Sequence, residues 1–134
     1  MTPSAEALIK AARDVQSRAH APYSRFMVGA ALATPSGEVF TGCNVENASF
    51  GLTICAERSA VVAAVAAGHS EFSAIAVVSR GGVAPCGACR QVLREFSADL
   101  PIHMADAAGP HRTTDLSTLL PEAFASLDLS DADE

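Results

Sequence analysis

The most constraining feature of this sequence is the segment 73–79 (SAIAVVS), whose central residues Ala74–Val78 are all apolar. A strand with one solvent-facing side alternates apolar and polar residues, whereas a strand buried on both faces is continuously apolar. The segment therefore predicts a central strand with a layer packed against each side of its sheet. Helical patterns occur both before and after it, which favours an α/β domain.

Helical and β-rich segments alternate along the rest of the chain. Residues 4–20 are expected to form a helix, with Ser4 as its N-cap and apolar residues at helical spacing. Residues 26–34 and 38–45 are β-rich and are separated by the turn signal PSG, which predicts a hairpin. The remaining predicted elements are a helix over 55–67, a helix from Pro85 to about Phe96, a strand over 100–106 and a short helix within 113–124. This order predicts helices on both faces of a mixed sheet.

Composition and charge narrow the class of protein. The chain has 134 residues, of which 49% are hydrophobic, so it can fill the core of one domain. We expect a single domain over 1–134, with about 126–134 as a disordered tail. The formal net charge of -6 argues against a nucleic-acid partner, which needs a basic face. The sequence shows neither a run of about eighteen apolar residues nor a signal-peptide pattern, so we expect no membrane partner and a cytoplasmic location.

Three of the four cysteines lie in two short pieces, TICAERSA (53–60) and APCGACRQ (84–91). Cys86 and Cys89 are close together at a predicted helix start, so their sulfurs share one face, and Cys55 opens another predicted helix. Helix N-termini stabilise anions, so two such ends that meet could hold three thiolates. Zinc suits this donor set, and three protein ligands leave a fourth position open for water, as in catalytic sites.

Glu57 is suited to handle the proton of that water. Residues two positions apart do not share a helix face, so Glu57 and Cys55 converge only if Cys55 precedes the first helical turn. Three thiolates with Zn²⁺ carry a net charge of about -1 by formal counting, which weakens the metal as a Lewis acid. We expect Arg58 to compensate by donating hydrogen bonds to a ligand sulfur, with Arg90 as a second candidate.

Together these pieces resemble a known family. CAE and PCGAC look like the C-x-E…P-C-x-x-C signature of zinc-dependent deaminases. PYSRFMVGAAL, GCNVENASFG, CAERSA, PCGACRQVLREF and LLPEAF, which fall within 21–124, resemble the small homotetrameric cytidine deaminases. The resemblance implies a three-layer α/β/α sandwich with a central mixed sheet of about five strands. It also implies a homotetramer with sites at subunit interfaces, one Zn²⁺ per chain, and hydrolysis of cytidine and deoxycytidine to uridine and deoxyuridine with release of ammonia, in pyrimidine salvage.

The resemblance also implies roles for individual residues. It makes Glu57 the catalytic proton shuttle, and the zinc ligands that it implies are Cys55, Cys86 and Cys89. The substrate-binding residues that it implies are Phe26 against the base, the backbone N–H of Ala56 at the pyrimidine carbonyl, Asn44 and Glu46 at the ribose hydroxyls, and Phe124 in a neighbouring subunit's site. Phe50 departs from the family, which usually has tyrosine in the motif NASYG, so any hydrogen bond of that hydroxyl is lost.

Other interpretations of the same residues stay open. The motif CGAC alone is typical of a redox pair, although this leaves Cys55 and Glu57 unexplained. Cys43 is available as a fourth ligand of a purely structural zinc site, although it better fits a small buried strand residue. The substrate could be another aminopyrimidine nucleoside such as blasticidin S. A nucleic-acid editor and a non-catalytic, zinc-stabilised interaction domain are the remaining alternatives.

Overall fold

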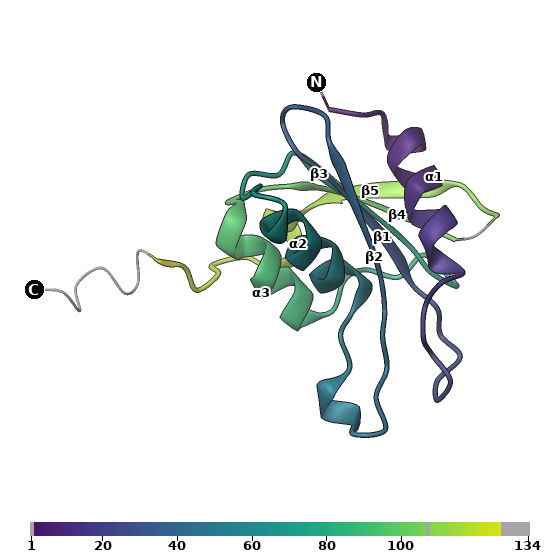
Figure 1. Cartoon of the computed structure of the whole chain (residues 1–134). Coiled ribbons are helices and arrows are strands. Elements are labelled where there is room, and N and C mark those ends of the chain that lie inside the picture. Colours follow the sequence, from purple (N-terminus) through teal and green to yellow (C-terminus); the bar gives the residue numbers. More distant parts are fainter. Residues whose placement is uncertain (1, 107, 127–134) are drawn as a thin grey trace, which may run out of the picture.

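A five-stranded sheet runs through the centre of the computed structural model, which describes residues 2–106 and 108–126 (Figure 1). The strands are β1 (Gly29–Ala33), β2 (Val39–Cys43), β3 (Ala74–Val78), β4 (Pro101–Ala105) and β5 (His111–Asp115). The helices are α1 (Ala5–Gln16), α2 (Ala56–Ala66), α3 (Gly87–Phe96) and α4 (Leu116–Leu119), with a 3-10 turn η1 (Phe50–Leu52). The strand order is β2-β1-β3-β4-β5. Only β3 and β4 are parallel among these pairs, so the described sheet is mixed, as expected.

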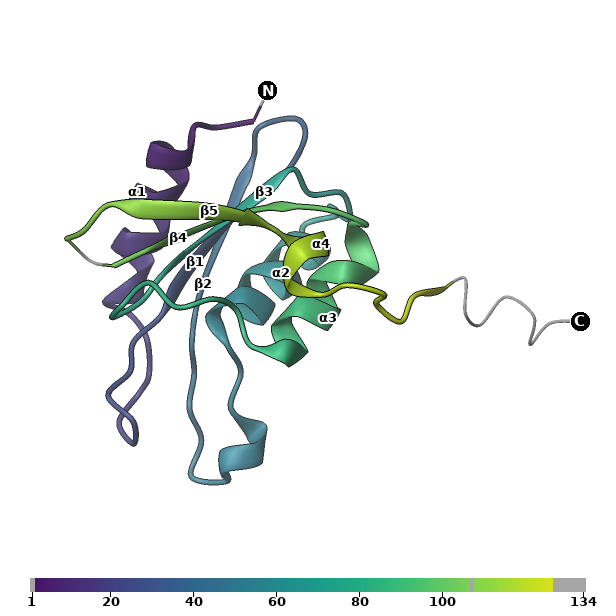
Figure 2. The same cartoon turned by 180° about the vertical axis from the view of Figure 1, so that it is seen from behind.

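Helices cover both faces of this sheet. The helix α1 lies on one face, and α2 and α3 lie on the other, which gives three layers (Figures 1 and 2). Each face has its own apolar core: Leu8 of α1 belongs to one cluster, and Ile75 and Leu93 belong to the other. Every residue of β3 is buried, which confirms the central strand that the apolar segment predicts. The α/β sandwich that the sequence indicates is therefore confirmed.

Two glycines let the helices lie very close to the sheet. A Cβ atom on Gly29 would lie 2.0 Å from the carbonyl oxygen of Ala12 in α1. A Cβ atom on Gly42 would lie 2.4 Å from the backbone nitrogen of Ala60 in α2. Neither steric clash with the backbone could be relieved without moving a helix, so both positions require glycine. The second contact fixes α2, whose N-terminus carries the candidate site, against β2.

The largest difference from the sequence analysis lies at the end of the chain. The segment His111–Asp115 forms strand β5, which pairs antiparallel with β4, whereas the pattern analysis predicted only a short helix in this region. β5 is an edge strand and has no fully buried residue. Its sequence HRTTD can therefore form a strand without any apolar residue. The short helix follows as α4, and the expected tail from about 126 lies almost wholly outside the described residues. No helix in the described part of the chain is long and apolar enough to cross a membrane.

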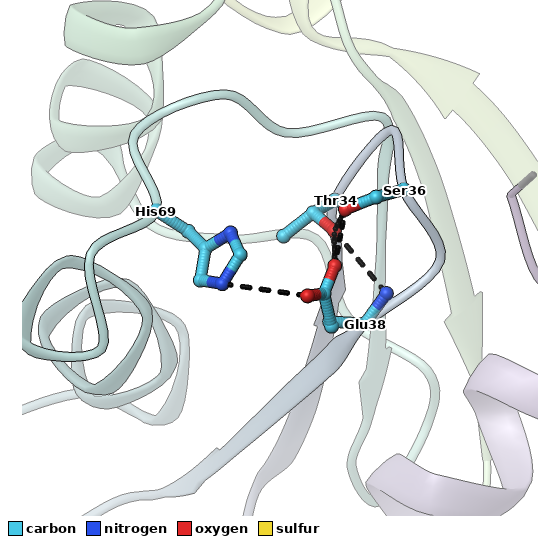
Figure 3. A network of polar contacts seen from close by, with 4 residues as sticks. All are labelled: Thr34, Ser36, Glu38 and His69. Carbon is cyan, nitrogen blue, oxygen red and sulfur yellow. Dashed lines mark hydrogen bonds and ion pairs between the residues drawn. The ribbon is translucent and has the colours of Figure 1, made fainter.

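A polar network closes the β1–β2 hairpin at the end of the sheet opposite η1 (Figures 1 and 3). The hydroxyl of Thr34 donates to Glu38 Oε1 over 2.9 Å, and the hydroxyl of Ser36 donates to the same oxygen. His69 Nε2, from the segment after α2, lies 3.6 Å from Glu38 Oε2. The hydrogen bond from Ser36, with that from Thr34, lowers the pKa of the Glu38 carboxyl. The network ties the hairpin turn to the C-terminal end of α2.

Candidate functional site

Three cysteine sulfurs meet where two helices begin. Cys55 is the N-cap of α2 and Cys86 is the N-cap of α3, both with extended backbone, while Cys89 lies in the first turn of α3. The Sγ atoms of Cys55 and Cys86 are 3.9 Å apart, and those of Cys86 and Cys89 are 3.5 Å apart. All three Sγ atoms lie within 4.8 Å of one another. Because both helix N-termini point at this cluster, their dipoles favour the thiolate forms.

The cluster has the dimensions and chemistry of a zinc site. Tetrahedral coordination with Zn–S distances of about 2.3 Å separates two sulfur ligands by about 3.8 Å. The separations of 3.9 and 3.5 Å match this spacing without any movement of the backbone. Cys43, which is partly buried at the end of β2, is not part of the cluster. The donor set therefore fits zinc with three protein ligands.

Arg58 lies beside the sulfurs. Its Nη2 atom donates to Cys55 Sγ over 3.4 Å and to the carbonyl oxygen of Thr53 over 3.5 Å. A hydrogen bond from the Cys89 thiol, together with Arg58, lowers the pKa of the Cys55 thiol to about 5. The hydrogen bond to Cys55 raises the pKa of Cys89, which holds the proton of the pair. Cys55 is therefore the sulfur that most readily carries a negative charge.

Arg90 has a different set of partners. Its Nε atom donates to the carbonyl oxygen of Pro85 over 2.7 Å, and its Nη1 atom donates to that of Leu119 over 2.8 Å. These bonds join the start of α3 to the end of α4. Arg90 therefore holds the backbone just before Cys86, and Arg58 is the arginine that contacts a sulfur.

A cavity of about 200 Å³ opens beside the sulfurs. Cys55 and Cys86 line the cavity, and Phe26, Val28 and Val83 form apolar parts of its wall. Its exposed lining is mostly apolar, so a planar ring with a few polar atoms suits it better than a charged group does. Thiolates at the rim of an apolar cavity place any bound metal within reach of a small organic ligand.

Glu57 lies in the same cavity wall although it follows Cys55 by only two positions. The two side chains converge because Cys55 is an N-cap with extended backbone and lies outside the helical turn that contains Glu57. Only 5% of Glu57 is exposed. Burial raises the pKa of its carboxyl to about 7. Burial of an ionisable carboxyl group costs free energy. A buried glutamate with a raised pKa is therefore typical of a functional residue rather than of a solvated one.

Phe26, Asn44 and Ala56 also line this cavity. Only 8% of Asn44 is exposed, and its side-chain amide forms hydrogen bonds with the backbone of the segment that carries Phe26 and Val28. Its Oδ1 atom accepts from the N–H of Val28 over 2.9 Å, and its Nδ2 atom donates to the carbonyl oxygen of Phe26 over 2.8 Å. Asn44 therefore holds the segment that carries Phe26, a task that its position in the sequence did not reveal.

Glu46 lies in an adjoining pocket rather than in the cavity itself. Tyr23, Ser24 and Phe50 line this pocket with it, and Thr53 lines both spaces. Glu46 Oε1 accepts from the backbone N–H groups of Tyr23 and Ser24 over 3.0 and 3.2 Å, and the Ser24 hydroxyl donates to Oε2. The hydrogen bond from that hydroxyl lowers the pKa of the Glu46 carboxyl. Glu46 thus fixes the loop before Phe26 and lines a pocket that shares the lining residue Thr53 with the cavity.

Phe124 lies outside the cavity of its own chain. Its side chain is 57% exposed, and its carbonyl oxygen accepts from Gln91 Nε2 over 2.8 Å, which holds it near α3. The structure thus brings together most of the predicted site residues: Cys55, Cys86, Cys89, Glu57, Arg58, Phe26, Asn44 and Ala56. Glu46 lies in the adjoining pocket, and Phe124 does not line the cavity. The sequence does not predict the other lining residues, because apolar side chains and a lone threonine carry no chemical signal: Val28, Thr53, Val77, Val83 and Ala84.

Comparisons with known proteins agree with this geometry. The family described as "Cytidine and deoxycytidylate deaminase zinc-binding region" matches residues 2–104. The chain is 44% identical to the cytidine deaminase of Sporosarcina psychrophila over 132 residues, which cover 96% of this chain and 97% of that one. It is 46% identical to the cytidine deaminase of Halalkalibacterium halodurans over 127 residues, which cover 92% of this chain and 96% of that one.

A solved structure shows the same fold. The crystal structure of cytidine deaminase from Burkholderia pseudomallei superposes with a TM-score of 0.87 at 52% sequence identity, and the match covers 91% of this chain and 100% of that one. The family match includes the segments that carry Cys55, Glu57, Cys86 and Cys89. The chain therefore belongs to the family of zinc-binding cytidine and deoxycytidylate deaminases.

Proposed function

We propose that this chain is a zinc-dependent enzyme that hydrolyses cytidine and deoxycytidine to uridine and deoxyuridine and releases ammonia. One observation carries the proposal: two cysteines of the three-sulfur cluster, Cys55 and Cys86, and the buried residue Glu57 line one cavity of about 200 Å³. The relatives named cytidine deaminase support it, because they match this chain over nearly their whole length. Pyrimidine salvage is the metabolic role that such a reaction serves.

Cys55, Cys86 and Cys89 would hold the zinc ion. When bound, zinc supplies Lewis acidity, which lowers the pKa of water towards neutrality and so makes a nucleophile available. Arg58 would offset the charge of the thiolates, because its N–H group already donates to Cys55 Sγ. Arg58 would thereby limit the loss of Lewis acidity that three anionic ligands cause.

Glu57 would carry the protons of the reaction. Its carboxylate would accept a proton from the attacking water and deliver it to N3 of the cytosine ring while the new bond to C4 forms. Glu57 would then carry the proton of the new C4 hydroxyl to the amino group on C4, which leaves as ammonia when the C4–N bond breaks and the C4 carbonyl forms. Burial favours this role, because a carboxyl group shielded from solvent exchanges protons with the substrate rather than with bulk water.

The substrate would lie between these groups and the Phe26 wall. The ring of Phe26 would pack against the base, and the N–H of Ala56 would donate to the pyrimidine carbonyl, since the first N–H groups of a helix lack intrahelical acceptors. Asn44 and Glu46 would bind the ribose hydroxyls with the lone pairs and protons that their backbone contacts leave free. The place of Glu46 in the adjoining pocket suits this role, because the sugar extends away from the base.

The enzyme would act as a homotetramer in the cytoplasm, with Phe124 of each chain reaching a neighbour's site. The apolar surface supports this assembly: Phe50 is 72% exposed, and Leu52, Val62 and Phe124 are also exposed. Phe50 and Leu52 lie together in η1, and exposed apolar side chains that are contiguous are typical of protein–protein interfaces. Phe50, which replaces the family's usual tyrosine, packs edge-on against Tyr23 with ring centroids 5.5 Å apart.

A substrate panel tests the proposal. Purified protein is incubated separately with cytidine, deoxycytidine, cytosine, CMP and blasticidin S, and the products are separated by chromatography. The proposal expects conversion of the two nucleosides and little turnover of the base or the nucleotide. Turnover of blasticidin S alone would move the substrate assignment, and a zinc-loaded protein that converts none of the five would contradict the proposal in favour of an interaction domain.

A further inference from the structure

Arg80 lies over the ring of Phe26. Its guanidinium carbon is 5.3 Å from the ring centroid, a distance at which a cation and an aromatic face attract each other. The cavity beside the sulfurs is lined by Phe26 but, among the described residues, not by Arg80. Phe26 therefore contacts the cavity, and Arg80 contacts the substrate space only through Phe26.

We propose that Arg80 is a positioning residue for substrate binding: its guanidinium holds the Phe26 ring in the orientation that receives the base. The inference rests on the proposed function, in which Phe26 packs against the base. It adds a residue from the loop after β3 that neither the motifs nor the cavity lining includes.

The backbone that carries Arg80 is held firmly. The turn after β3 is closed by hydrogen bonds from Gly82 N to the carbonyl oxygen of Ser79 over 3.0 Å and from Val83 N to the Ser79 hydroxyl over 3.1 Å. Gly81 N donates to Asp106 Oδ2 over 2.9 Å. Gly82 has a φ of 60°, and a Cβ atom there would lie 3.3 Å from the backbone of Ala105. The backbone at Arg80 is therefore held in place, so only its side chain has to be ordered for the guanidinium to reach the Phe26 ring.

Hydrogen bonds hold the backbone of Phe26, whereas its ring is oriented only by the side chains that pack around it. The N–H of Phe26 donates to the Ser24 hydroxyl over 3.0 Å, and its carbonyl oxygen accepts from Asn44. Arg25, just before it, has a φ of 60°, a strained value for a residue with a side chain. Phe26 is partly buried, so the groups that border its ring contribute to the choice of its rotamer. Arg80 is the charged group that borders its face.

A ring that is ordered in advance binds its ligand at lower entropic cost. The groups that would carry the chemistry, the cysteines and Glu57, do not depend on Arg80 in this structure. Loss of the guanidinium should therefore weaken substrate binding and leave the chemical step unchanged, so KM rises while kcat stays constant. A cation–π pair at an exposed site corresponds to a change of about two- to fivefold in KM.

The test is a double-mutant cycle with cytidine as substrate. Arg80→Met keeps much of the side-chain length and removes the charge, Arg80→Lys restores a cation, and Phe26→Leu removes the aromatic face. Arg18→Met makes the same change in net charge at another exposed arginine and serves as the control. We expect Arg80→Met to raise KM by about two- to fivefold with kcat unchanged, and Arg80→Lys to recover part of the loss. In the Phe26→Leu background, Arg80→Met should have no further effect.

Three results would overturn the inference. They are an unchanged KM in Arg80→Met, an equal rise in KM in the Phe26→Leu background, and a rise of the same size in Arg18→Met. A failure of the proposed function gives a different pattern, because the wild-type protein would then convert no cytidine, whereas a wrong role for Phe26 alone would leave KM unaltered in Phe26→Leu. Thermal unfolding of each variant shows that a change in KM is not a loss of fold, since Arg80 is exposed and its replacement leaves the core intact.

Discussion

Asn44 offers the sharpest test of how the site is built. Asn44→Ala removes the acceptor of the Val28 N–H and the donor to the Phe26 carbonyl, with hydrogen bonds of 2.9 and 2.8 Å. Water could replace these partners only in part, because Asn44 is 8% exposed and the two backbone groups are partly buried. Each lost hydrogen bond costs about 1–1.5 kcal/mol in such surroundings, so the free energy of unfolding should fall by about 2–3 kcal/mol.

The control for this prediction is Asn47→Ala. Asn47 also uses its Oδ1 atom to accept from a backbone N–H, that of Ser49 at 2.9 Å, but the pair is exposed. Water replaces an exposed acceptor, so this variant should lose less than about 1 kcal/mol. Urea unfolding, followed by circular dichroism at one fixed protein concentration, gives both values. If Asn44→Ala is no less stable than Asn47→Ala, the reasoning that Asn44 braces the Phe26 segment is wrong.

Three further outcomes are expected. Arg58→Met should retain the fold but bind zinc about 10- to 100-fold more weakly, because it loses the hydrogen bond to Cys55 Sγ, and competition with a chelator measures this. Glu57→Gln should keep its zinc and lose a factor of about 10² to 10⁴ in kcat, and full activity would exclude the proton-carrying role. The hydrogen bonds that lower the pKa of Glu38 stabilise the fold at pH values above 4.5, the ordinary pKa of the carboxyl. This stabilisation is lost as the pH falls through the lowered pKa. Glu38→Gln should therefore be less stable than wild type near pH 7, and the difference should shrink as the pH falls below 4.5, as thermal unfolding at a series of pH values would show.

The sequence predicts the parts of the fold that are buried. The apolar segment of β3 and the glycine-marked hairpin of β1 and β2 are confirmed, as is the Ser4 cap, whose Oγ accepts from Ala7 N over 3.1 Å. The strand β5 could not be predicted from pattern, since HRTTD lacks apolar alternation and is held mainly by its backbone bonds to β4. Helix α1 ends at Gln16 rather than at residue 20, because His20 instead forms a β-bridge with Val45, in which its N–H donates to the carbonyl oxygen of Asn44 over 2.9 Å.

The sequence also predicts the sulfur cluster, for a local reason. The spacing of Cys86 and Cys89 and the position of Cys55 place their sulfurs at helix N-termini, and short-range geometry largely decides where they point. The bracing of Phe26 by Asn44 and the contact of Arg80 with its ring were not predictable in this way. Both join segments that are far apart in the chain, and only the pairing of β1 with β2 and β3 brings them together.

X-ray absorption at the zinc edge of the purified, zinc-loaded protein tests the central claim most directly. We expect one zinc per chain with three sulfur ligands at about 2.3 Å and one oxygen or nitrogen ligand, because three cysteines cluster and Cys43 is not among them. Cytidine should change the spectrum of this open position. Four sulfur ligands that do not respond to cytidine would contradict the account and identify the metal as structural.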